Sequence, residues 1–138
     1  MNKYGEAAIK AVEMIQTGKE KSPIDAWKSA TNHIFGEGNS SQSKSCPKDT
    51  FLSICETGSV KGIDVGKYTR SIKNRSYALK ALDLINENSD YAEDPEALWM
   101  LVQGESVKVH NAQMNVVIAM WNADLIEKRG EIDENRNW

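Results

Sequence analysis

The sequence is poor in the residues that build cross-linked, secreted or membrane-spanning proteins. Its 138 residues include only two cysteines, too few for a disulfide framework, which favours the reducing cytosol. Lys3, Glu6 and Lys10 stand where a signal peptide needs an apolar stretch. The longest apolar run, Val116 to Trp121, is much shorter than the ~20 residues of a membrane-spanning helix. We therefore expect a cytoplasmic protein that makes no membrane contact.

Sequence signatures of catalysis and of metal binding are also missing. There is no glycine-rich phosphate loop, nucleophile elbow, paired-carboxylate signature or metalloprotease helix. The two cysteines and two histidines, Cys46, Cys55, His33 and His110, lack the paired spacing of a zinc site. We predict no metal and no cofactor, and the sequence leans away from an enzyme.

No stretch alternates convincingly between apolar and polar residues, as a half-buried strand would. Apolar residues instead recur every three or four positions, which is typical of amphipathic helices. Six helices are predicted: residues 2–16, Pro23 up to Gly36, Pro47 up to Gly58, a start between Ser71 and Asn74 up to about Asn86, Pro95 up to Gly104, and Ser106 or Asn111 up to about Ile126. The fold class is therefore all-α, a compact single-domain bundle over residues 1–126. A short extended segment near residues 60–66 is conceivable, and residues 127–138 form a polar C-terminal tail.

Local signals set the helix starts and the expected core. Ser22–Pro23 and Asp94–Pro95 each combine a capping side chain with a proline suited to the first helical turn. Trp27, Trp99 and Trp121 lie on the apolar faces of three different helices, and their burial would supply much of the core. The last helix has the densest apolar face, so we expect it to run through the middle of the bundle.

The charges are unevenly distributed along the chain. Residues 59–80 hold six basic side chains and one acidic one, a net charge of +5, so the remainder carries −8 within the total of −3. Seven acidic residues follow from Asp83 to Glu105 with no basic residue between them. Such neighbouring blocks can form an anion-binding face, or they can be solvated surfaces that attract each other.

The first candidate site lies in the basic segment. Its members are Lys61, Lys67, Tyr68, Arg70, Lys73 and Arg75. Aromatic rings between cations suit contact with phosphates and bases, so a nucleic acid or another polyanion is one candidate partner and an acidic protein surface is another. A helix-turn-helix is disfavoured because the turn from Gly58 to about Ser71 is too long, and the isoelectric point is 5.4.

The second candidate is a polar pocket formed by Cys46, His110, Asn111 and Asn115. Cys46 precedes Pro47 at the expected N-cap of the third helix, where the helix dipole favours a thiolate. His110 shares a face with Met114 and Trp121, and the asparagines border that face. Each of these residues can equally be structural, as buried histidines and cysteines usually are. An enzyme that uses Cys46 or His110 is the least favoured hypothesis.

Two non-enzymatic functions remain. We prefer a binding module whose surface at residues 61–80 engages a polyanion or an acidic partner. The alternative is a structural helical domain without a ligand, which forms homo-oligomers when its basic and acidic blocks pair between subunits.

Three segments resemble a family of small bacterial proteins with a domain of unknown function. They are CPKDTFLSICETGSVKGI (46–63), GKYTRSIKNRSYALKA (66–81) and HNAQMNVVIAMWNADLI (110–126). The resemblance covers residues 46–126 and extends to the whole chain. It implies a stand-alone bacterial cytoplasmic domain, implies no activity or substrate, and directs attention to the surroundings of Cys46 and His110 together.

Overall fold

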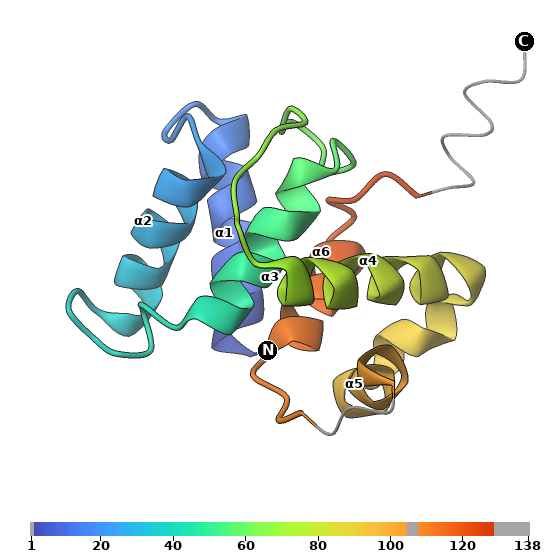
Figure 1. The fold of residues 1–138 in the computed structure, drawn as a ribbon. Coiled ribbons are helices and arrows are strands. Elements are labelled where there is room, and N and C mark those ends of the chain that lie inside the picture. Colours follow the sequence, from blue (N-terminus) through green and yellow to red (C-terminus); the bar gives the residue numbers. More distant parts are fainter. Residues whose placement is uncertain (1, 105–107, 129–138) are drawn as a thin grey trace, which may run out of the picture.

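The computed structural model describes residues 2–104 and 108–128, and these form an all-α bundle (Figure 1). Its elements are α1 (Lys3–Gln16), α2 (Pro23–Phe35), α3 (Ser45–Glu56), α4 (Ile72–Glu87), the short 3-10 helix η1 (Ser89–Glu93), α5 (Pro95–Gln103) and α6 (Gln113–Asn122). Six α-helices and the all-α class agree with the sequence prediction. None of the described helices is both long enough and apolar enough to cross a bilayer.

The predicted caps at Ser22 and Asp94 are confirmed, and α4 begins within its predicted range, with Ser71 as its cap. The Ser22 hydroxyl accepts a hydrogen bond from the Asp25 amide at 3.2 Å. The Ser71 hydroxyl likewise accepts the Asn74 amide at 3.3 Å. Asp94 Oδ1 accepts the amides of two residues in the first turn of α5 at 3.1 and 3.2 Å. Each cap satisfies donors that a helix cannot pair internally.

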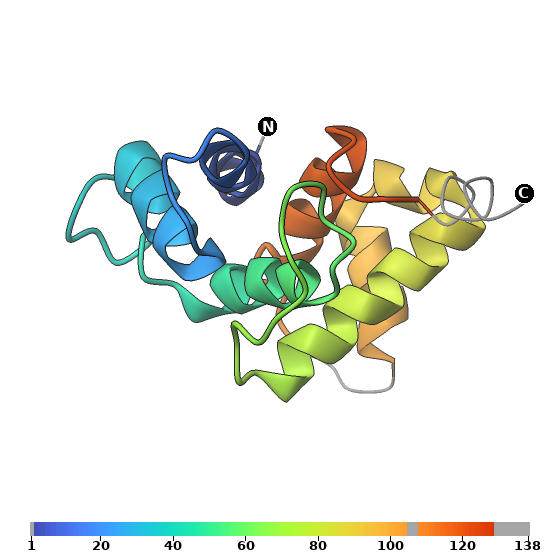
Figure 2. The ribbon, with the colours of Figure 1, turned by 90° about the horizontal axis from the view of Figure 1, so that it is seen from above.

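Helix α6 occupies the centre of the bundle, as its apolar face predicted. It contacts α1, α3, α4 and α5, and Met114, Val116, Val117 and Met120 are fully buried. Viewed from above, α3 and α6 lie between the α1–α2 pair and the α4–α5 pair (Figure 2). The prediction that three tryptophans are buried is confirmed, because Trp27, Trp99 and Trp121 all belong to one continuous core.

Two predicted bounds of the last helix are wrong. The helix begins at Gln113, because Ala112 adopts a left-handed backbone conformation with φ of 67°, which cannot continue a right-handed helix. The alternative start at Ser106 lies outside the described residues. The helix ends at Asn122, and Asp124 is also left-handed, with φ of 59°. Ile126 is therefore not helical.

The chain after α6 is extended and pairs with the start of the α3–α4 connection. Ile126 and Val60 form an isolated antiparallel bridge. The Lys61 amide donates to the Leu125 carbonyl at 2.8 Å, and the Glu127 amide donates to the Ser59 carbonyl at 2.7 Å. Of the extended segment considered near residues 60–66, the described chain shows only the single bridge at Val60. Of the proposed tail, residues 129–138 lie outside the described residues.

The start of the third helix also differs from the prediction. Helix α3 begins at Ser45, its N-cap is Lys44, and no side chain caps it. Cys46 is therefore the second helical residue and not the N-cap. Pro47 is tolerated at the third position because the first four amides of a helix have no internal acceptor.

Candidate functional site

The first part of the basic segment is an irregular connection that leads from α3 into α4, and a buried acid holds it in place. Glu56, the last residue of α3, has a side chain that is only 2% exposed. Its Oε2 atom accepts the amide of Tyr68 at 2.6 Å and the amide of Thr69 at 2.9 Å. Burying a carboxylate is costly unless it is paired. These two bonds therefore fix the connection on α3.

Glu56 also binds one of the predicted site residues. Arg75 Nη2 lies 2.6 Å from Glu56 Oε1, so an ion pair with a buried carboxylate holds this arginine in place. The Thr69 hydroxyl donates to Asp49 Oδ1 at 2.9 Å, which adds a second attachment to α3. Sequence reasoning missed Glu56. The available signal was its position four residues after the apolar Leu52, which places an acid on the buried face of α3.

The structure divides the six predicted basic-site residues. Lys67, Tyr68, Arg70 and Arg75 line one pocket of about 620 Å³ at the start of α4, here called the basic pocket. Lys61 lies elsewhere and pairs with Asp124 at 3.2 Å. Lys73 lines a different, neighbouring pocket.

Three cations in this region have no acidic partner in the described chain. Across residues 2–104 and 108–128, no acidic oxygen lies within 4.0 Å of the charged atoms of Lys67, Arg70 or Lys73. All three residues are exposed. Of the predicted cations, Lys61 and Arg75 are neutralised locally, whereas these three are left to interact with solvent or a ligand.

Tyr68 forms part of the wall of the basic pocket and is held in one orientation. Its hydroxyl donates to the Asp64 carbonyl at 2.8 Å. Burial, and secondarily the nearby acidic groups, raise the pKa of Tyr68 above its ordinary value of 10.0. The ring lies against Gly66, where an added Cβ would come within 2.7 Å of Tyr68 Cζ. A larger residue at this position would therefore displace the Tyr68 ring.

The charges along α4 oppose its macrodipole. The first turn contains Lys73 and Arg75 but no acid, and the last turn has no base. A helix prefers the reverse arrangement by about 0.3–1 kcal/mol for each charge. Sixteen residues give a helix of about 24 Å, well beyond the ~8 Å Debye length. The basic start and the acidic end therefore do not neutralise each other.

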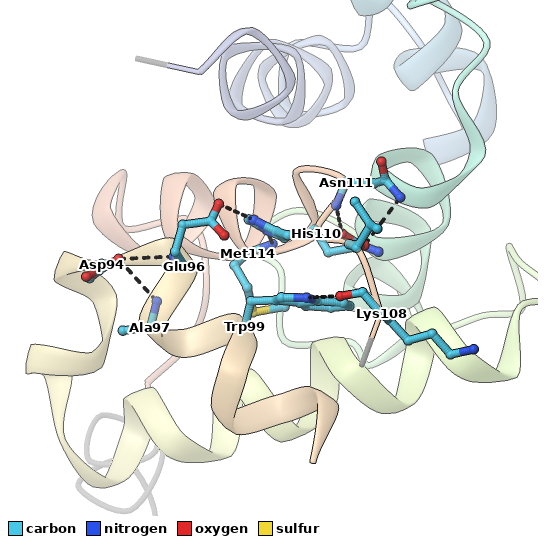
Figure 3. A network of polar contacts seen from close by, with 10 residues as sticks. Asp94, Glu96, Ala97, Trp99, Lys108, His110, Asn111 and Met114 are labelled. Carbon is cyan, nitrogen blue, oxygen red and sulfur yellow. Dashed lines mark hydrogen bonds and ion pairs between the residues drawn. The ribbon is translucent and has the colours of Figure 1, made fainter. Parts of the chain in front are cut away.

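His110 caps the start of α6 (Figure 3). Its Nε2 accepts the Met114 amide at 3.1 Å, and its Nδ1 lies 2.7 Å from Glu96 Oε1. The ring stacks on Trp99, with centroids 5.3 Å apart. Because Nε2 accepts, the proton resides on Nδ1 and is donated to Glu96. The imidazole supplies the cap that the methyl side chain of Ala112, the N-cap residue, cannot provide.

The predicted polar pocket is only partly assembled. Cys46 and Asn111 line one pocket of about 220 Å³. Asn115 lines another, of about 280 Å³, which faces α1. His110 uses both ring nitrogens on Glu96 and Met114, so it is not available as a base for Cys46. Cys55 is fully buried, and burial raises the pKa of its thiol.

These features define a class of protein: a small all-α domain with a preorganised basic pocket at the start of one helix. The chain belongs to a family of unknown function (DUF6979), whose match spans residues 1–127. The resemblance to an uncharacterised domain family is thereby confirmed. Comparisons with curated proteins and with solved structures give no match.

Proposed function

We propose that the protein is a non-enzymatic module that binds a polyanion through Lys67, Arg70, Lys73 and Arg75. The observation that carries the proposal is a set of three exposed cations, Lys67, Arg70 and Lys73, that have no acidic partner among residues 2–104 and 108–128. Lys67 and Arg70 line the basic pocket. The phosphate groups of a polymer are the favoured ligand. When several cations of the protein bind such a polyanion, its condensed counterions are released, and this release increases the affinity.

The rigidity of the connection supports this function. The amides of Tyr68 and Thr69 are bound to Glu56, so the cations that flank them project from a fixed backbone. A preorganised surface loses less conformational entropy when it binds. Arg75 uses one guanidinium nitrogen on Glu56 and retains other donors for a ligand.

The unfavourable charge order of α4 also supports a role in binding. Lys73 weakens the helix by standing at its positive end, and residues that break a local rule without structural gain are characteristic of functional surfaces. The proposed setting is the bacterial cytoplasm, since both Cys46 and Cys55 are free thiols.

A second candidate function is self-assembly. The basic start of α4 and the acidic residues Glu87, Asp90 and Glu93 lie at opposite ends of the α4–η1 segment. Such a separation disfavours pairing within one molecule and permits pairing between two copies. An acidic partner protein would use the same cations.

The test is binding of a fluorescent single-stranded DNA and of heparin at several salt concentrations. The double variant Lys67→Glu/Arg70→Glu removes two phosphate contacts, so the slope of log affinity against log salt for the single-stranded DNA should become less steep by about 1.4. The control Lys19→Glu/Lys28→Glu changes the net charge equally at exposed positions of the α1–α2 region and should leave binding unchanged.

Equal binding by both double variants would overturn the proposal. Light scattering on the same samples separates the second candidate. A dimer that dissociates at high salt, together with no DNA or heparin binding, would favour self-assembly. Absence of polyanion binding by a monomer would leave the acidic partner protein as the remaining occupant.

A further inference from the structure

The small pocket that contains Cys46 differs in kind from the basic pocket. It lies between the start of α3, the first turns of α4 and the segment before α6, and its volume is about 220 Å³. That volume equals roughly seven water molecules in the liquid, which suits a small organic or inorganic anion. We call it the thiol pocket, after Cys46.

The thiol pocket is cationic. Lys73 and Lys108 both line it, and none of its lining residues is acidic. In the described chain no carboxylate lies within 4.0 Å of either ammonium group. Two cations that face the same small space repel each other, and an anion between them removes that repulsion.

A chain of amides fixes two walls of the pocket relative to each other. Gln113 is 3% exposed. Its Oε1 accepts the Asn111 amide at 2.6 Å, and its Nε2 donates to Asn74 Oδ1 at 3.4 Å. Asn74 Nδ2 in turn donates to the Ser71 hydroxyl at 3.1 Å. The segment before α6 is thus tied to the start of α4 through buried polar groups.

The backbone that carries Lys108 is also fixed. Its carbonyl accepts the Trp99 indole N–H at 2.9 Å, as Figure 3 shows, and its amide donates to Gln103 Oε1 at 2.8 Å. Trp99 contributes its aromatic surface to the pocket and packs edge-on against Tyr77, with centroids 4.9 Å apart. The pocket therefore has a rigid aromatic side and a fixed backbone at Lys108.

We propose that the thiol pocket binds a small anion that carries a carboxylate or phosphate group, between Lys73 and Lys108 and in contact with Cys46. The ligand is a small molecule, and the site shares Lys73 with the proposed polyanion surface but none of Lys67, Arg70 and Arg75. Asn111 and Tyr77, which carry neutral hydrogen-bond donors, line the same space.

The thiol of Cys46 provides a direct probe of the local charge. Iodoacetate is an anionic alkylating agent and iodoacetamide is a neutral one of similar size. Both react by the same displacement of iodide by sulfur. The ratio of their rates at Cys46, divided by the ratio for the same residue in the urea-unfolded chain, should be about five or more, because one unit charge near the two lysines gains about that factor.

Matched variants assign this preference to the pocket. Lys108→Glu should abolish the preference for iodoacetate. Lys80→Glu, an equal charge change on an exposed position of α4 outside the pocket lining, should keep it. Arg70→Glu should also keep it while weakening heparin binding, so failure of the polyanion proposal is distinguishable. Peptide mass spectrometry separates Cys46 from the buried Cys55.

Ligand titration then identifies the chemistry. Inorganic phosphate and succinate are added separately at constant ionic strength, and the Trp99 indole N–H signal is followed by NMR. Saturable shifts with one anion, lost in Lys108→Glu, support the proposal and show which group is bound. Equal alkylation ratios in the folded and unfolded chain, or no saturable shift with either anion, would overturn it.

Discussion

Two irregular connections carry the candidate sites, and they are stabilised in opposite ways. The α3–α4 connection is tied to Glu56, whose carboxylate is buried and charged. The α5–α6 connection is tied through His110, which is neutral, while its acidic partner Glu96 has a side chain that is 74% exposed. A buried charge is expensive to leave unpaired, whereas a hydrogen bond to an exposed carboxylate contributes little. Removal of the acid should therefore destabilise the protein more at the first connection than at the second.

The largest expected effect comes from Glu56→Ala. The change leaves the amides of Tyr68 and Thr69 without their acceptor and frees Arg75, so the free energy of unfolding should fall by about 2–4 kcal/mol. Glu56→Gln should cost less, because one oxygen can still accept both amides. Urea denaturation measures both values. Equal destabilisation by Glu96→Ala and Glu56→Ala would contradict the difference between the two connections.

A smaller effect is expected from His110→Ala. Loss of the α6 cap and of the stack on Trp99 should lower the free energy of unfolding by about 1–2 kcal/mol. Hydrogen exchange of the Met114 amide should also become faster, since His110 Nε2 is its acceptor. The matched variant Glu96→Gln should cost less than about 1 kcal/mol and leave that exchange rate nearly unchanged. Unchanged exchange in His110→Ala would contradict the capping role.

The effect that is smallest at neutral pH appears under alkaline conditions, and it involves Tyr68 of the first connection and Cys55 of the adjoining helix α3. Burial raises the pKa of Cys55 and of Tyr68 above their ordinary values of 9.0 and 10.0. Above those values the unfolded chain loses protons that the folded chain retains, so stability is fully present at neutral pH and falls as the pH rises. Urea denaturation between about pH 8 and about pH 11 should show a shallower fall in Tyr68→Phe and in Cys55→Ala. His110→Ala, in the second connection, should keep the slope of the parent chain.

The starts of three helices could be predicted because their causes are local. Ser22, Ser71 and Asp94 cap helices through bonds to amides two or three residues away, and such spacing is visible in the sequence. The bounds of α6 could not be predicted, because the left-handed Ala112 and the bridge from Ile126 to Val60 depend on partners far along the chain.

The candidate sites were predictable in composition but not in arrangement. The sequence identified Lys67, Arg70 and Lys73 as a basic group, yet it could not show that Arg75 is held by Glu56 or that Lys61 pairs with Asp124. Similarly, the chemistry of His110 depends on Trp99 and Glu96, which are 11 and 14 residues away.

The sequence by itself determined the all-α class, most helix bounds and the central place of the last helix, because apolar periodicity and capping act within one or two helical turns. Only the tertiary structure decided which charges are neutralised and which residues share a pocket. Those outcomes depend on burial and on contacts between distant segments. A glutamate carboxylate fixes the chain when it is buried, as in Glu56, and contributes little to stability when it is exposed, as in Glu96.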